Sequence, residues 1–216
     1  MQPTSPRLYL IRHAETQWTL SGQHTGRTDV ELTPHGQDQA RALEQVLRPI
    51  AFDHVLTSPA QRARQTCALA GLATTATVAP DLAEWDYGDY EGRTSSEIHL
   101  QRPGWNVFQD GCPGGESAAA ITQRADRLIA HLATLSGNVA LFSSGQFGCS
   151  LAVRWVGLPV GQAQHLLLNT ASCSILAANP SHPETRVIAL WNYSPGRFAA
   201  DDAHGPESKI FPPHAV

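Results

Sequence analysis

An arginine and a histidine, Arg12 and His13, directly follow an apolar run at residues 8–11. Such a run predicts a buried β-strand, and open α/β sheets bind their ligands at the carboxyl ends of their strands. A neutral imidazole there can attack phosphorus and divide one displacement into two easier steps. Negative charge then gathers on the phosphoryl oxygens and requires fixed cations nearby. We therefore interpret His13 as a candidate nucleophile and Arg12 as a candidate phosphate ligand.

A second arginine, Arg62, occurs where another expected strand, at residues 53–57, gives way to a helix. Ser58 and Pro59 have the residue types of an N-cap and a first helical position, which places Arg62 in the first turn. A helix amino terminus attracts anions, and an arginine can bind phosphate with two parallel hydrogen bonds. Taken alone, such an arginine is more often a solvated surface residue. Its partnership with the first motif favours the phosphate pocket.

Aromatic residues and carboxylates alternate at residues 84–92, which read EWDYGDYEG. Aromatic packing beside a carboxyl group favours its protonated form. A protonated carboxyl can donate to a departing alkoxide and then activate water against a phosphohistidine. Glu84 is the candidate for this task. We expect Asp86, Asp89 and Glu91 to be solvated or structural, because a loop this polar contains carboxylates without a catalytic role.

Taken together, these segments resemble the histidine phosphatase superfamily, also called phosphoglycerate mutase-like, from residue 8 to residue 191. Residues 10–16 resemble the family's nucleophile motif, and the segment around Arg62 resembles its second arginine motif. Residues 84–92 support Glu84 as the acid and are similar to the small sugar-bisphosphatase branch. The resemblance implies an α/β fold: a three-layer α/β/α sandwich with a mostly parallel central sheet.

The chain departs from the family's pattern at several positions. At Ser144 the family would normally carry a histidine that contacts the transferring phosphoryl group. A serine is shorter and cannot carry a positive charge. Thr19 stands where the family often has asparagine, and Gln23 stands where an arginine is frequent. Loss of one oriented donor can lower a rate about a hundredfold to a thousandfold, so these departures predict impaired or divergent phosphatase chemistry.

Two more segments match the family. Residues 21–29 resemble the loop after the nucleophile, where backbone amides and a hydroxyl can line a phosphate. Residues 110–117 resemble the segment that shapes the substrate side, although helix capping is the simpler account of this glycine-rich turn. With His13 and Glu84 as the catalytic pair, the expected phosphate-binding set is Arg12, Arg62, Thr19, Gln23, Thr25, Ser144 and Gly145. His24 is expected to be structural or at the surface.

Three functions remain open at this stage. The first is a phosphohydrolase that acts on a small phosphorylated metabolite through a phosphohistidine. The second is an isomerase, lyase or dehydratase that uses His13 and Glu84 as acid and base in the same anion pocket. The missing imidazole at Ser144 motivates this alternative, and the third is a non-catalytic anion-binding protein. We favour the first because the nucleophile, both arginines and the acid are present.

The composition of the 216 residues, 42% hydrophobic and 16% charged, permits one sizeable core. We expect one domain over residues 1–193 and a C-terminal tail over residues 194–216. The net charge of −4 without a basic block argues against nucleic acid or an anionic membrane surface as partners. Without a long apolar run or a signal-peptide pattern, the expected location is cytoplasmic. The expected partner is a small anion, and a homodimer remains open.

Neither a metal nor another cofactor is expected. No spacing of His, Asp or Glu suggests a metal, and the inferred mechanism needs none. The cysteines at positions 67, 112, 149 and 173 are far apart, which argues against a zinc site or a disulfide framework. We expect them to be reduced, mostly structural thiols.

Short β-rich runs alternate with helical patterns along the chain, which predicts a sheet with helices on both faces. The expected strands are residues 8–11, 53–57, 75–78, 138–142, 173–178 and 186–191. Thr33 and Pro34 mark one helix start, and Ser117 opens a helix with an apolar stripe from Ile121 to Leu135. The irregular residues 82–115 are expected to cross over the active-site end of the sheet.

Overall fold

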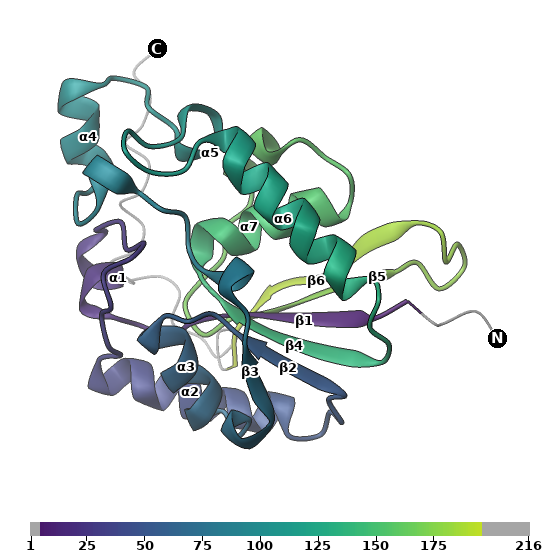
Figure 1. Ribbon diagram of the computed structural model, residues 1–216. Helices are drawn as coiled ribbons and strands as arrows, with labels where there is room; N and C mark the ends of the chain where they lie inside the picture. Colours follow the sequence, from purple (N-terminus) through teal and green to yellow (C-terminus); the bar gives the residue numbers. More distant parts are fainter. Residues whose placement is uncertain (1–4, 196–216) are drawn as a thin grey trace, which may run out of the picture.

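The computed structural model describes residues 5–195, which form a six-stranded sheet between two layers of helices (Figure 1). The strands are β1 (Arg7–Arg12), β2 (His54–Thr57), β3 (Ala76–Val78), β4 (Asn138–Ser143), β5 (Cys173–Ala178) and β6 (Arg186–Tyr193). They lie in the order β3-β2-β4-β1-β5-β6, with β5 and β6 antiparallel to their neighbours. The predicted mostly parallel sheet is confirmed. Beyond its first two residues, the expected tail lies outside the described residues.

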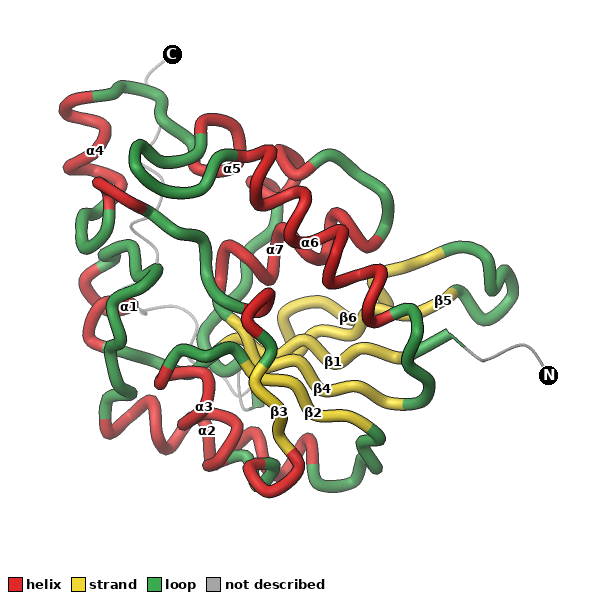
Figure 2. Tube along the Cα trace, in the orientation of Figure 1, coloured by secondary structure: helices red, strands yellow, loops and turns green. Residues whose placement is uncertain are grey.

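The helices are α1 (Gln17–Ser21), α2 (Pro34–Leu47), α3 (Gln61–Leu69), α4 (Ser95–Gln101), α5 (Val107–Asp110), α6 (Ala118–Leu132) and α7 (Gly145–Trp155). Helices α2 and α3 cover one face of the sheet, and α6 and α7 cover the other (Figure 2). Short 3-10 turns are η1 (Ala73–Thr75), η2 (Pro80–Leu82), η3 (Gly88–Tyr90) and η4 (Val160–His165). Buried residues of α2 and α3 form one hydrophobic cluster with the sheet, and those of α6 and α7 form the other. The predicted sandwich is therefore present.

Strand β1 is buried on both faces because it lies in the middle of the sheet. Leu8 and Leu10 belong to the cluster under α6 and α7, while Tyr9 and Ile11 belong to the cluster under α2 and α3. Successive side chains of a strand point to opposite faces, so this division follows from the pleat. The register pairs Arg12 at the end of β1 with Ser143 at the end of β4. The residues that follow the two strands, His13 and Ser144, therefore leave the sheet at the same edge.

Two of the expected helix starts are confirmed and one is wrong. The side chains of Thr33 and Ser117 accept hydrogen bonds from the first turns of α2 and α6, as their residue types predicted. Helix α3 begins at Gln61, two residues after Pro59, and its N-cap residue has no side-chain cap. The Oδ1 atom of Asp29, from a distant loop, accepts the Gln61 N–H at 2.6 Å instead. A long-range contact thus supplies the acceptor that Ser58 was expected to provide.

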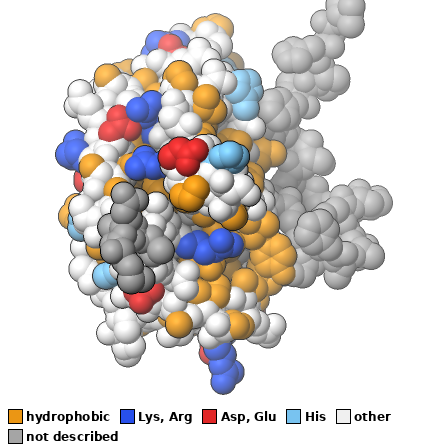
Figure 3. Space-filling model, turned by 90° about the vertical axis from the view of Figure 1, so that its right-hand side faces the viewer, with side chains coloured by type: hydrophobic (Ala, Val, Ile, Leu, Met, Phe, Trp, Pro, Cys, Tyr) orange, Lys and Arg blue, Asp and Glu red, His pale blue; other side chains and the backbone are white. Residues whose placement is uncertain are grey.

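The predicted excursion between β3 and α6 carries η2, η3, α4 and α5 and lies on the side where the parallel strands end (Figure 1). Within this segment, the backbone of Gly88 packs closely against residues 113–115, and its φ is +51°. A Cβ there would lie 2.2 Å from the Pro113 carbonyl oxygen, so only glycine fits. Figure 3 shows the opposite end of the molecule, where basic and acidic side chains are interspersed. Within residues 5–195, no helix has the length and apolar character needed to cross a membrane.

Candidate active site

His13 lies where β1 ends, beside the end of β4. Its backbone N–H donates to the Ser143 carbonyl at 2.9 Å, which extends the ladder between the two strands by one residue. The ring Nδ1 lies 2.8 Å from the Ala14 carbonyl oxygen. Because that oxygen can only accept, Nδ1 carries the hydrogen and Nε2 keeps its lone pair. The contact therefore fixes the ring and leaves Nε2 without a hydrogen.

The environment of His13 keeps its imidazole neutral. Burial is the main cause that lowers its pKa well below the usual 6.5, and the guanidiniums of Arg62 and Arg12 lower it further. The Ala14 carbonyl acts in the opposite direction with less effect. A neutral imidazole is the form that can attack phosphorus. Burial and the two arginines therefore favour the nucleophilic form.

Arg62 is fully buried in the first turn of α3. Its Nη2 donates to the carbonyl oxygens of Thr25 at 2.9 Å and Gly26 at 3.1 Å, and its Nη1 donates to that of Thr28 at 3.1 Å. Its Nε has no partner among the described residues. Three of its five N–H groups thus fix the guanidinium on carbonyls, and the Nε–H is one of the two that remain for a ligand.

Arg12, at the end of β1, approaches the first residue of α7. Its Nη1 donates to the Leu168 carbonyl oxygen. A Cβ added to Gly145 would lie 3.3 Å from the Cζ and Nε atoms of Arg12. Such a contact is tight, so the absence of a side chain at Gly145 lets the guanidinium lie against the helix end.

Glu84 caps α7 from outside the helix. Its Oε1 accepts from the backbone N–H groups of Trp85 at 2.8 Å and Phe147 at 2.7 Å, and its Oε2 accepts from that of Gln146 at 2.9 Å. These bonds satisfy two of the amides that a helix start leaves without partners. The carboxylate therefore meets amide donors where the sequence predicted aromatic packing, and its orientation is fixed relative to α7.

Ser144 occupies the N-cap position of α7, between the His13 side of the sheet and the helix that Glu84 caps. It is fully buried, and its hydroxyl has no hydrogen-bond partner among the described residues. A buried hydroxyl without a partner is costly unless a ligand or water meets it. Because Glu84 serves the helix amides, the serine hydroxyl is not needed as a cap.

Three expected phosphate ligands use their side chains within the neighbouring loop. The Thr19 hydroxyl donates to the Thr16 carbonyl at 2.8 Å and closes a capping box on α1. The Gln23 amide donates to the Gly92 carbonyl at 2.8 Å, and the Thr25 hydroxyl donates to the Gln23 carbonyl at 3.2 Å. Thr25 still reaches the site, because its own carbonyl binds Arg62. Phosphate contacts by these three side chains stay predictions.

A cavity of about 450 Å³ lies beside Glu84. The loop with Gly26 and Asp29, the turn at residues 59–60 and the segment with Glu84 and Asp86 form its walls. Glu84 lines this cavity and His13 does not. Its volume could hold the leaving group of a small phosphate ester.

Residues 8–192 match the model of the histidine phosphatase superfamily (branch 1). The chain belongs to this superfamily. An acid phosphatase of Mycobacterium tuberculosis is 44% identical over 188 residues, covering 85% of this chain and 92% of the relative. The sedoheptulose 1,7-bisphosphatase of Saccharomyces cerevisiae is 35% identical over 193 residues, covering 74% and 71%.

Solved structures agree with this family assignment. The structure of an open reading frame from Mycobacterium tuberculosis has a TM-score of 0.81 at 39% identity, covering 87% of this chain and 97% of the other. A mycobacterial glucosyl-3-phosphoglycerate phosphatase has a TM-score of 0.76 at 27% identity, covering 87% and 99%. The predicted family and the phosphoglycerate mutase-like fold are confirmed. The chain is an enzyme of the histidine phosphatase fold, and its relatives act on phosphorylated small molecules.

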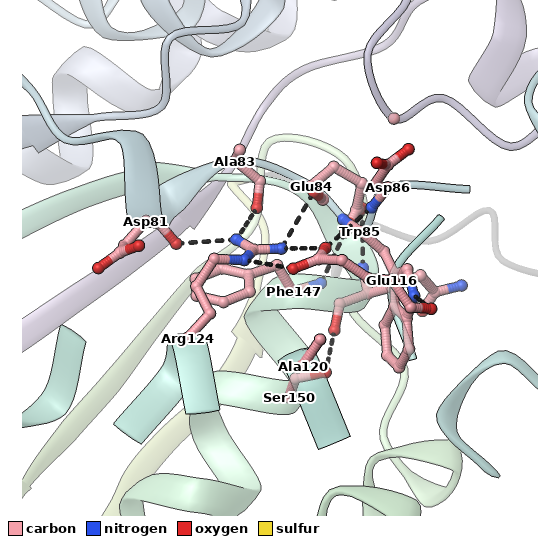
Figure 4. A network of polar contacts seen from close by, with 12 residues as sticks. Asp81, Ala83, Glu84, Trp85, Asp86, Glu116, Ala120, Arg124, Phe147 and Ser150 are labelled. Carbon is pink, nitrogen blue, oxygen red and sulfur yellow. Dashed lines mark hydrogen bonds and ion pairs between the residues drawn. The ribbon is translucent and has the colours of Figure 1, made fainter. Parts of the chain in front are cut away.

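This histidine phosphatase holds its Glu84 segment with a residue that the sequence reasoning missed, Arg124 of α6 (Figure 4). Its guanidinium pairs with both carboxylate oxygens of Glu116 and donates to three carbonyls at residues 81–84. It also lies 4.3 Å from the ring centroid of Phe147. Helical periodicity could have revealed it, because Arg124 follows Ile121 by three residues on the buried stripe.

Tyr87 is a second residue that the sequence reasoning missed. It is buried, and burial followed by the charge of Glu84 raises its pKa well above 10. Arg12 and Arg62 act in the opposite direction, which places the phenol within the field of the same charged groups. His24 stacks on Tyr87 with ring centroids 4.6 Å apart, and burial lowers the His24 pKa to about 4. His24 therefore has the structural role that was expected.

The cysteines are buried and unpaired in the described structure, as expected of reduced thiols. Burial raises the pKa of each of them to about 12. Thiols with such pKa values are unreactive near neutral pH. Within residues 5–195, no group of three or more His, Cys, Asp and Glu side chains is placed to hold a metal ion.

Proposed function

We propose that this histidine phosphatase hydrolyses a small phosphorylated metabolite through a phosphohistidine at His13. The observation that carries the proposal is the neutral imidazole of His13, oriented by Ala14 and flanked by two arginines. The partnerless Nε of Arg62 supports an anion at this place. The sequence-based alternatives, a non-hydrolytic enzyme and a non-catalytic binder, have no comparable support.

The geometry suggests a role for each group in two steps. In the first, Nε2 of His13 bonds to phosphorus, the ester P–O bond breaks, and Glu84 gives a proton to the leaving oxygen. In the second, Glu84 takes a proton from water, the water oxygen bonds to phosphorus, and the P–N bond breaks. Inorganic phosphate leaves and His13 is neutral again. Arg12 and Arg62 would hold the phosphoryl oxygens throughout.

Ser144 would supply a hydroxyl donor to the same phosphoryl group in place of the family's imidazole. A neutral hydroxyl stabilises developing negative charge less than an imidazolium does, because hydrogen bonds from charged donors are about twice as strong. We therefore infer slow turnover, with Ser144→His raising it about a hundredfold or more.

Phosphate release from 4-nitrophenyl phosphate and a panel of sugar phosphates tests the proposal. Release by the natural chain that disappears in His13→Ala, together with a trapped phosphohistidine, is the expected result. If neither the natural chain nor Ser144→His releases phosphate, the proposal is wrong. Turnover without phosphohistidine that needs both His13 and Glu84 would favour the non-hydrolytic alternative.

Cytoplasmic location remains a prediction from the sequence, and whether the chain forms a homodimer remains open. Light scattering after size-exclusion chromatography measures the mass in solution and so tests the second.

A further inference from the structure

The charged side chains that line the cavity beside Glu84 are mostly acidic. Apart from Glu84, the proposed acid, they comprise three carboxylates and two arginines: Asp29, Asp86, Glu116, Arg27 and Arg124. Under the proposed function, Glu84 protonates the leaving oxygen, so the rest of the leaving group would occupy this cavity. The charge of its walls therefore bears on which leaving groups the site accepts.

Arg124 has no donor left for a ligand (Figure 4). Its Nε and Nη2 donate to the two oxygens of Glu116 at 2.9 and 2.7 Å. The remaining contacts are to the carbonyls of Asp81 at 2.9 Å, Ala83 at 2.7 Å and Glu84 at 3.2 Å. A guanidinium has five N–H donors, and all are engaged here. Arg124 could bind an anionic substrate group only by releasing the segment that carries Glu84.

Arg27, the other arginine of the cavity, is already paired. Its Nη2 lies 2.7 Å from Oδ2 of Asp86, and its side chain is 82% exposed. An exposed arginine that already has a partner adds little to the binding of a second anion. The Asp86 side chain is only 18% exposed, and its Oδ1 accepts the Gly88 N–H at 3.1 Å. The Asp86 carboxylate is thus fixed in the cavity wall, while its counterion extends into solvent.

The two ends of the site therefore differ in charge. Arg12 and Arg62 act on His13 at the phosphoryl end, whereas carboxylates outnumber arginines in the cavity beside Glu84. Carboxylate oxygens accept strong hydrogen bonds from hydroxyl groups. A second phosphate would bring like charge to the same oxygens, which disfavours binding about fivefold for each contact at 4 Å in water.

We propose that the site prefers phosphate monoesters whose leaving group is an uncharged polyol, discriminates against bisphosphates, and owes this preference chiefly to Asp86. The proposal rests on the proposed function, because that function places the leaving group beside Glu84. It deepens that function by naming the class of leaving group.

Fructose 6-phosphate and fructose 1,6-bisphosphate are a suitable pair of probes, since they differ by one phosphate. Calorimetric binding to His13→Ala compares them without a covalent step, so the result stands whether or not the natural chain hydrolyses either sugar. We expect the bisphosphate to bind at least about fivefold more weakly. Equal or tighter binding of the bisphosphate, or no binding of fructose 6-phosphate, would overturn the proposal.

Asp86→Asn in the same background tests the residue. Asparagine keeps an Oδ1 acceptor for the Gly88 N–H, so the substitution changes charge with little change of shape. We expect the ratio of the two dissociation constants, bisphosphate over monophosphate, to fall at least about fivefold in this variant. One negative charge that repels the second phosphate disappears, and Arg27 loses its partner. Asp38→Asn is the matched control: Asp38 is an exposed residue of α2, outside the cavity lining, and its loss changes the net charge equally. It should leave the preference unchanged.

An unchanged ratio in Asp86→Asn, or the same change in Asp38→Asn, would contradict the role of Asp86. Release of phosphate from 4-nitrophenyl phosphate by the natural chain, measured in parallel, reports on the proposed function alone. Hydrolysis of this aryl ester together with a preference for the bisphosphate would overturn the leaving-group proposal and leave the phosphohydrolase proposal standing.

Discussion

At the scale of single residues, the buried imidazole of His13 sets the expected pH dependence. Its pKa lies well below 6.5, chiefly because of burial and then because of Arg62 and Arg12. The proposed nucleophile therefore stays neutral at pH values where an ordinary histidine is mostly protonated. We predict that kcat/KM for 4-nitrophenyl phosphate shows no acid limb near pH 6.5. Phosphate release between pH 4 and 8 measures this, and a decline with an apparent pKa near 6.5 would contradict it.

At the scale of elements, α6 positions Glu84, the proposed acid, through Arg124. The variant Arg124→Met would leave the mostly buried Glu116 carboxylate and three carbonyls at residues 81–84 without their donor. Breaking a buried ion pair costs about 3–5 kcal/mol, so the free energy of unfolding should fall by about this amount. Denaturant unfolding followed by circular dichroism measures it. Arg41→Met, which breaks an exposed pair with Asp38, should change the same quantity by less than about 1 kcal/mol.

A loss in Arg124→Met no larger than in Arg41→Met would show that the network is not stabilising. Arg124→Lys is a further comparison, since it keeps the charge but removes the planar fork. If Arg124→Lys is more stable than Arg124→Met but still has a lower kcat for 4-nitrophenyl phosphate than the natural chain, the planar guanidinium is what positions Glu84.

At the scale of the whole molecule, the sequence predicted what depends on local pattern and missed what depends on distant contacts. The buried run at residues 8–11 identified β1 and, with it, the place of His13. The start of α3 depends on Asp29, more than thirty residues away in the chain. The roles of Arg124 and Tyr87 depend on loops that only the packed fold brings beside Glu84. Expected ligands such as Gln23 lie in the right loop, but their side chains bind its backbone.

The buried histidine also links the stability of the whole chain to pH. Since the folded-state pKa of His13 is depressed, the unfolded chain takes up a proton below pH 6.5 that the folded chain does not. The free energy of unfolding should therefore fall as pH falls below 6.5, by about 1.4 kcal/mol at pH 5.5 from this residue. His13→Asn cannot take up that proton in either state. We expect the difference in unfolding free energy between pH 7.5 and 5.5 to shrink by about this amount in the variant. His24, whose pKa is about 4, adds loss of the same sign in both proteins and cancels in the comparison. An unchanged difference would mean that His13 titrates normally in the folded chain, and the neutral nucleophile on which the proposed chemistry depends would lose its physical basis.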